Sequence, residues 1–183
     1  MAIAKGLVTA EELARLPDDG FRYELIDGEL KQMPPVGGEH GGVTTDFAST
    51  LRTYVKAHGL GWVLAGDTGV LLRRDPDHVR MPDVCFVSRE RLPEGRLPKG
   101  HLPFVPDLVV EVVSPYDRAS EVQAKIGEWL TGGARLVWAV YPDTRQIVAY
   151  RSLTEIRIYG ERDVIDAEPV LPGFKTSVAE LFD

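Results

Sequence analysis

Pro106-Asp107-Leu108-Val109-Val110-Glu111-Val112-Val113-Ser114-Pro115 is the stretch that decides the predicted fold. Its near-continuous apolar run, residues 108–113, is typical of a strand that other elements cover on both faces. A helix is predicted over residues 119–130, and a second, almost wholly apolar strand over residues 135–140. This order of strand, helix and strand predicts a right-handed βαβ crossover within a sheet.

One carboxylate interrupts this apolar run. Glu111 has two valines on each side, and an acid there is costly to bury unless it is paired, hydrogen-bonded or bound to a metal. A second acid, Asp83, lies in an earlier strand-like segment, and Lys125 lies on the helix that follows Glu111. If the two strands are neighbours, one face holds both carboxylates, which suits Mg²⁺ or Mn²⁺ with its waters. We expect Lys125 to stabilise charge beside a scissile phosphate.

Each of these residues also has a purely structural interpretation. Lys125 follows Asp117 and Glu121 at helical spacing, so the three can form a solvated ladder of ion pairs, the commoner arrangement on an arbitrary helix. Asp83 follows a proline and can equally be an acid at a turn or a strand end. For Glu111 a paired or functional role is favoured, because apolar residues flank it on both sides.

The whole chain, residues 1–183, is predicted to be one α/β domain: a central mixed sheet flanked by helices, with an N-terminal helix and β-hairpin. A capping box at Thr9 and Glu12 begins the first helix, and Asp27-Gly28 is a strong hairpin signal. Gly59 ends a helix predicted over residues 43–58. Further strands are expected over residues 61–65, 70–73, 79–87, 146–151 and 155–159, and a short last helix over residues 177–182.

Two loops are of interest for function. Residues 88–106 are rich in proline, glycine and charge, and they predict an unusually long surface loop, a candidate lid or substrate-contact segment. Residues 34–42 contain four glycines and predict a flexible loop before the first long helix. His40 in that loop is either a proton shuttle or a surface residue, and the surface interpretation is favoured because a lone histidine is a weak signal.

Composition restricts the class of protein. The chain is 44% apolar and carries a net charge of −7, which argues mildly against a general binder of nucleic acid, although a cluster of metal-binding acids would itself add negative charge. The chain has no run of 18 apolar residues, so no membrane helix is predicted, and residues 1–6 do not resemble a signal peptide. The single cysteine, Cys85, excludes an intramolecular disulfide and is expected to be a small buried apolar residue. A cytoplasmic protein is therefore expected.

Several motifs together resemble the Uma2 family of restriction endonucleases, within the PD-(D/E)XK nuclease superfamily. The resemblance extends over about residues 9–182. The motifs that carry it are Arg22-Tyr23-Glu24-Leu25-Ile26-Asp27-Gly28-Glu29-Leu30, Pro82-Asp83 before an apolar strand, the stretch from Pro106 to Pro115 followed by a lysine on a helix, and Leu171-Pro172-Gly173-Phe174.

This resemblance implies a restriction-endonuclease-like core and a set of site residues. Asp83 matches the strand aspartate of the superfamily, and Glu111 matches the acid of its second motif. The superfamily places a lysine two residues later, where this chain has Val113, so the lysine of the site is expected to be Lys125 instead. Glu24 corresponds to a further acid that supports the metal, and its structural alternative is a cross-strand partner on the hairpin.

Two functions are therefore expected as alternatives. The first is a Mg²⁺-dependent endonuclease that cleaves nucleic acid, DNA rather than RNA, in which Asp83, Glu111 and Glu24 hold the metal and Lys125 stabilises the transition state. The second is a non-catalytic nucleic-acid-binding or regulatory module on the same fold, which the acidic charge and the displaced lysine favour. A homodimer would suit the cleavage of both strands of a duplex.

Overall fold

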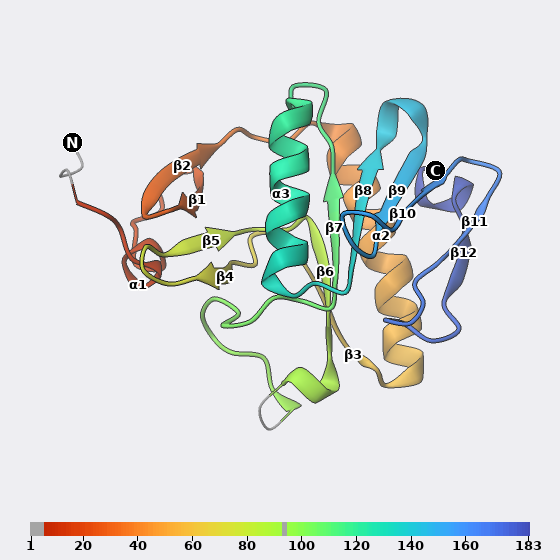
Figure 1. The fold of residues 1–183 in the computed structure, drawn as a ribbon, viewed down its shortest axis with the longest axis horizontal. Coiled ribbons are helices and arrows are strands. Elements are labelled where there is room, and N and C mark those ends of the chain that lie inside the picture. The colour runs from red at the N-terminus through yellow and green to blue at the C-terminus, as the bar shows by residue number, and fades with distance from the viewer. Residues whose placement is uncertain (1–5, 93–94) are drawn as a thin grey trace.

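The structure is a computed structural model that describes residues 6–92 and 95–183. Two sheets lie next to each other, the smaller one built mainly from the N-terminal part of the chain (Figure 1). The elements in chain order are α1 (Ala10–Leu13), β1 (Arg22–Ile26), β2 (Glu29–Met33), α2 (Gly38–His58), β3 (Gly61–Ala65), β4 (Val70–Arg73), β5 (His78–Arg80), β6 (Val84–Ser88), η1 (Arg89–Arg91), β7 (Leu108–Val112), α3 (Ala119–Gly132), β8 (Leu136–Tyr141), η3 (Pro142–Thr144), β9 (Gln146–Tyr150), β10 (Ile156–Tyr159), β11 (Val164–Asp166), β12 (Lys175–Ser177) and η4 (Ala179–Leu181).

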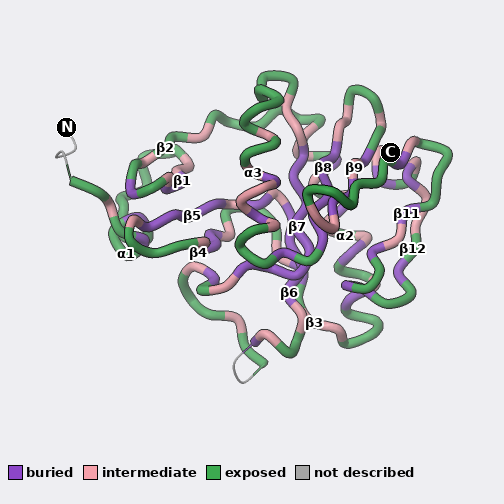
Figure 2. Tube along the Cα trace, viewed as in Figure 1, coloured by how far each residue is buried: buried purple, intermediate pink, exposed green. Residues whose placement is uncertain are grey.

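The larger sheet has six strands in the order β10-β9-β8-β7-β6-β3. β7 and β8 run parallel, with Glu111 opposite Ala139, and α3 connects them, so the predicted βαβ unit is confirmed. The other neighbouring strands pair in antiparallel fashion, and the mixed sheet is therefore also confirmed. α2 and α3 lie on opposite faces of this sheet (Figure 1), and its central strands are buried (Figure 2).

The alternation of side chains along β7 decides which helix meets Glu111. Leu108, Val110 and Val112 belong to the apolar core that contains the buried face of α2. Val109 belongs to the other core, together with Ile126 of α3. Because successive side chains of a strand point to opposite faces, Glu111 shares the face of Val109 and is directed toward α3.

The smaller sheet is antiparallel, with the strand order β2-β1-β5-β4. Its first hairpin turns at Asp27 and Gly28, which have φ values of 53° and 82°. Two consecutive residues with positive φ are what a tight hairpin turn needs, so the predicted hairpin is confirmed. A separate small apolar core, which includes Leu25 and Val79, holds this sheet against α1.

The prediction of a single strand over residues 79–87 is wrong, because the structure divides this segment between the two sheets. β5 ends at Arg80 in the smaller sheet, and β6 begins at Val84 in the larger one. Met81, Pro82 and Asp83 connect them. Pro82 has no N–H to donate to a ladder, which is why a strand stops at such a position.

The flexible loop expected over residues 34–42 is also partly wrong. α2 begins at Gly38, five residues before the predicted start, so His40, Gly41 and Gly42 lie in its first turns. Glycine lowers the helix propensity of a segment, and for this reason the pattern predicted a loop. The other end agrees with the prediction, because Gly59 caps the helix with a left-handed φ of 64°.

The remaining segments differ from the expectation in smaller ways. Residues 88–106 form a long connection that includes the short helical turn η1, and residues 93–94 of this predicted lid lie outside the described part. The expected last helix is the single turn η4, preceded by a ribbon of β11 and β12 that was not predicted. Cys85 is fully buried, as expected. Within the described residues, no helix has the length and apolar character needed to cross a membrane.

Candidate active site

The four predicted site residues converge from four separate segments. Glu24 comes from β1 of the smaller sheet, Asp83 from the connection between the sheets, Glu111 from β7 and Lys125 from α3. β6 pairs directly with β7, with Val84 opposite Val110. The strands next to Asp83 and Glu111 are therefore neighbours, as the predicted site requires.

Lys125 contacts two of the acids. Its Nζ donates to Oε2 of Glu111 at 2.8 Å and lies 3.6 Å from Oε1 of Glu24. Burial lowers the pKa of Lys125, but the charges of the two glutamates outweigh this effect, and the net pKa is raised. The ammonium therefore keeps its proton at neutral pH.

The alternative of a solvated ladder on α3 is not what the structure contains. Asp117 precedes the helix, and its Oδ2 accepts the backbone N–H of Ser114. Glu121 lies 3.9 Å from Lys31 of β2. Lys125 is directed instead into the site, where its side chain is 21% exposed.

Glu111 is held from both sides of its carboxylate. Oε2 accepts from Lys125, and Oε1 accepts from Nε1 of the fully buried Trp129 at 2.7 Å. Burial raises the pKa of Glu111 to about 7; Lys125 acts to lower it, and the charge of Asp83 to raise it. The influence of Asp83 on this pKa places the two carboxylates within electrostatic reach of each other.

Asp83 is oriented by the strand that carries Glu111. Its Oδ2 accepts the backbone N–H of Val112 at 2.8 Å, next to Glu111 in the chain. Nε2 of His40 lies 3.4 Å from the same oxygen. The contact with Asp83 raises the pKa of His40, and the His40 side chain is only 14% exposed. The favoured interpretation of His40 as a surface residue is therefore wrong, because its helical turn brings it into the site.

Glu24 is the most buried of the four residues, at 1% exposed. Oε2 accepts from Nη1 of Arg80 at 2.7 Å, and Oε1 accepts the backbone N–H of Met81 at 3.0 Å. Burial alone would raise the pKa of Glu24, but the charges of Lys125 and Arg80 outweigh it, and the pKa is lowered. Lys31 faces Glu24 across the hairpin backbone, yet the carboxylate binds these other groups, so the cross-strand pairing is not formed.

Three further residues belong to this network, and none of them had a role predicted from the sequence: Arg80, Trp129 and Glu128. Trp129 is four residues after Lys125, a spacing that puts both on one helical face, and this was the available signal. Glu128 accepts from Nε and Nη2 of Arg80, at 2.7 and 3.0 Å. The contacts of Arg80 depend on how α3 packs against the smaller sheet, which no local pattern predicts.

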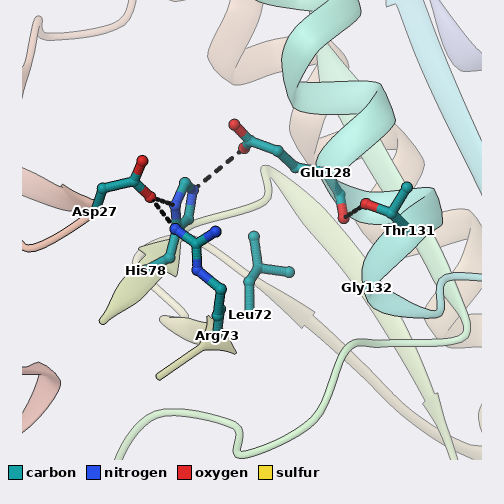
Figure 3. A pocket seen from close by; sticks show the side chains of 7 residues that line it. All are labelled: Asp27, Leu72, Arg73, His78, Glu128, Thr131 and Gly132. Atoms are coloured by element: carbon teal, nitrogen blue, oxygen red, sulfur yellow. Dashed lines mark hydrogen bonds and ion pairs between the residues drawn. The ribbon is translucent and has the colours of Figure 1, made fainter. Parts of the chain in front are cut away.

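A pocket of about 330 Å³ opens beside this network (Figure 3). His78 lies between two acids there: its Nδ1 is 2.9 Å from Oδ1 of Asp27, and its Nε2 is 3.3 Å from Oε2 of Glu128. Arg73 also pairs with Asp27. The contact with Glu128 raises the pKa of His78.

The charge balance of the site fits a divalent cation. Four carboxylates, those of Glu24, Asp83, Glu111 and Glu128, surround two permanent cations, Arg80 and Lys125. In the structure as it stands, residues 6–92 and 95–183 contain no group of three or more His, Cys, Asp or Glu arranged to hold a metal ion. Each carboxylate oxygen has two lone pairs, so Glu111 can keep its two hydrogen bonds and still bind a cation with Asp83.

Comparisons with known proteins give a consistent picture. The model of the Uma2 family, described as "Putative restriction endonuclease", matches residues 10–179. A solved structure from Anabaena variabilis ATCC 29413, described as a putative nuclease belonging to DUF820, superposes with a TM-score of 0.80 at 22% sequence identity. That comparison covers 96% of this chain and 97% of the other, and it shows a shared fold. Among curated proteins, no match was found.

Proposed function

The chain belongs to the Uma2 family, described as "Putative restriction endonuclease", and on that basis we propose that it is a metal-dependent endonuclease that hydrolyses phosphodiester bonds of DNA. The family description supports a nuclease in general, and the shared fold is consistent with it. The choice of DNA over RNA, the metal and the roles of individual residues belong to the proposal. A homodimer, with one site for each strand of a duplex, is proposed with them.

One observation carries the proposal. A half-buried lysine contacts a buried glutamate at 2.8 Å, and an aspartate fixed by the same strand lies within electrostatic reach of that glutamate. Buried acids with a raised pKa beside a cation are typical of functional sites. These residues come from segments 28 and 14 positions apart in the chain, which only the pairing of β6 with β7 and the packing of α3 bring together.

We assign Asp83 and Glu111 as the residues that would hold Mg²⁺ or Mn²⁺, because oxygen ligands from carboxylates are what these cations prefer. When bound, the cation would lower the pKa of a water molecule and neutralise charge on a phosphoryl oxygen. Glu24 would contribute to the metal only through the lone pairs that Arg80, Met81 and Lys125 leave free. Its first role is therefore to hold Lys125.

The residues of the chain have distinct tasks in this reaction. Lys125 keeps its proton on Nζ and stabilises the negative charge that develops on the phosphate in the transition state. Trp129 and Lys125 fix the orientation of the Glu111 carboxylate. His40, whose Nε2 lies 3.4 Å from Oδ2 of Asp83, would help to orient that carboxylate.

The first experiment measures cleavage of supercoiled plasmid, linear duplex and RNA with Mg²⁺, Mn²⁺ or EDTA. We expect metal-dependent cleavage by the wild type, and a loss of at least 100-fold in Glu111→Gln and in Asp83→Asn. Glu121→Gln is the matched control, because Glu121 lies on the same helix as Lys125 but pairs with Lys31 among the described residues. Full activity in Glu111→Gln would refute the assignment of the site.

A non-catalytic module on the same fold is the second candidate. The observation that favours it is that the described residues already satisfy both oxygens of Glu111 and of Glu24 with hydrogen bonds. Calorimetric titration of Mn²⁺ separates the candidates. Binding by the wild type that is lost in Glu111→Gln supports the nuclease, and nucleic-acid binding without any metal binding supports the module.

A further inference from the structure

Arg80 links the smaller sheet to the helix that carries Lys125. It is the last residue of β5, it is 8% exposed, and its guanidinium lies between carboxylates from two different elements. Nη1 donates to Oε2 of Glu24 at 2.7 Å, while Nε and Nη2 donate to the two oxygens of Glu128 at 2.7 and 3.0 Å. The paired contacts with Glu128 fix the plane of the guanidinium, and this plane sets the direction in which Nη1 meets Glu24.

Glu128 and Lys125 lie three residues apart on α3, so they occupy neighbouring positions on one helical face. Arg80 therefore ties Glu24 to the same turn of helix from which Lys125 extends. The Lys125 ammonium is held between Oε1 of Glu24 at 3.6 Å and Oε2 of Glu111 at 2.8 Å. If Glu24 turned away, one of the two anionic partners of this ammonium would be lost.

His78 holds Glu128 from the side of the pocket (Figure 3). Both ring nitrogens face carboxylate oxygens, Nδ1 that of Asp27 and Nε2 that of Glu128. A protonated imidazole has two donors and suits this arrangement, whereas a neutral one has only one. Glu128 is thus contacted by His78 as well as by Arg80.

We propose that Arg80 and Glu128 are positioning residues for phosphodiester cleavage, which hold Glu24 so that it fixes the Lys125 ammonium beside Glu111. This inference rests on the proposed nuclease function. In this role both residues act through Glu24 and Lys125. Arg80→Lys keeps the charge but removes the planar fork that binds both oxygens of Glu128 while Nη1 meets Glu24.

The kinetic test uses the full chain and an oligonucleotide duplex. We expect Arg80→Lys to lower kcat by 10- to 100-fold and to change KM by less than threefold. Arg151→Lys is the matched control, because Arg151 makes a comparable structural pair with Asp166, outside the candidate site and outside the long loop of residues 88–106. Its kcat should equal that of the wild type. An unchanged kcat in Arg80→Lys would overturn the proposal.

A double-mutant cycle asks whether Arg80 acts through Glu24. In the Glu24→Gln background, Arg80→Lys should lower kcat no further, because the residue through which it acts has already been changed. If the effects of the two substitutions on kcat multiply in full, Arg80 does not act through Glu24, and the proposal is overturned. A purely structural role would instead lower the stability of both backgrounds equally and leave kcat of the folded protein unchanged.

A second readout does not depend on activity. Nitrogen NMR of the lysine side chains should show one slowly exchanging ammonium signal in the wild type, assigned by its loss in Lys125→Met. We expect this signal in Arg151→Lys and expect it to disappear in Arg80→Lys and in Glu128→Gln, the latter serving if the former does not fold. Its persistence in the folded variants would overturn the positioning role. A wild type that cleaves no nucleic acid would instead overturn the proposed function, so the two failures are distinguishable.

Discussion

At the residue scale, Glu111 is an acid that the surrounding valines exclude from water. Its side chain is 9% exposed, and the polar partners of its carboxylate among the described residues are Lys125 and Trp129. Burial favours the neutral form of a carboxyl group, and a nearby cation favours the charged form. The raised pKa shows that burial is the stronger effect in the metal-free protein.

The first prediction concerns the titration of this residue. Carbon NMR of the metal-free protein should give Glu111 a pKa of about 7 rather than its ordinary value of 4.5. Because a metal ion competes with the proton for the carboxylate, the affinity for Mn²⁺ should fall about tenfold for each pH unit below 7. A Mn²⁺ affinity that is constant between pH 5.5 and 7.5 would contradict this prediction.

The second prediction concerns Trp129. Trp129→Phe removes the donor to Oε1 of Glu111, so it should raise the pKa of Glu111 further and lower the free energy of unfolding by about 2–3 kcal/mol. Trp138→Phe is the control, because Nε1 of this equally buried tryptophan has no partner among the described residues. NMR titration and urea unfolding measure the two effects. Equal shifts of the Glu111 pKa in both variants would refute the role of the hydrogen bond.

At the scale of elements, α3 places three functional side chains within five residues. Lys125 and Trp129 reach Glu111, and Glu128 reaches the smaller sheet through Arg80 and His78. The helix therefore connects the two sheets by ion pairs as well as by apolar packing, and the stability of that connection should depend on pH.

The third prediction follows from the pKa of Glu128. Burial acts to raise it, but the ion pair with His78 and the hydrogen bonds from Arg80 outweigh this and lower it to about 2, from an ordinary value of 4.5. A depressed pKa means that ionised Glu128 stabilises the fold above pH 4.5 and that this contribution disappears as the pH falls toward 2. Glu128→Gln should thus cost about 1–2 kcal/mol at pH 6 and progressively less in acid. Urea unfolding between pH 3 and pH 6 tests this, and a constant difference would contradict it.

The fourth prediction concerns the first turns of α2. Gly41 and Gly42 are helical, and a Cβ added at either position meets no atom within 4 Å. Alanine at each position should therefore raise the free energy of unfolding by about 0.4–1 kcal/mol. Gly59→Ala is the control with the opposite sign, because Gly59 has a left-handed φ of 64°. If Gly42→Ala destabilises the protein, the helical start of α2 is in doubt.

Local sequence patterns predicted correctly those elements that depend mainly on residues close together in the chain. The hairpin follows from Asp27-Gly28, and the βαβ unit follows from two apolar strands around a helix. The division of residues 79–87 between two sheets depends on what each half pairs with, although Pro82 was a visible signal. The site was predicted to include Glu24, Asp83, Glu111 and Lys125, whereas the contacts of His40 and Arg80 depend on packing between distant segments.

At the scale of the whole molecule, the net charge of −7 opposes the approach of a polyanion. The site adds to this repulsion, because its carboxylates outnumber its permanent cations. For a nuclease of this composition, a bound divalent cation would reduce the repulsion at the site itself.

The fifth prediction is that metal removal weakens substrate binding as well as cleavage. In EDTA, the Kd for a duplex oligonucleotide should be at least tenfold higher than with Ca²⁺, and the difference should be lost in Asp83→Asn. Fluorescence anisotropy at constant ionic strength measures it, because salt alone changes such affinities. Equal Kd values in EDTA and Ca²⁺ would show that the acids do not control binding.

The seam between the two sheets has a consequence for local unfolding. Glu24 belongs to the small sheet with its own apolar core, whereas Asp83, Glu111 and Lys125 are anchored to the large one. Small units with few apolar contacts open at lower free energy than a central core. Transient detachment of the small sheet would remove Glu24 from the site while β6, β7 and β8 stayed folded. Proteolysis or hydrogen exchange in residues 22–33 would then report the fraction of molecules in which the site is incomplete.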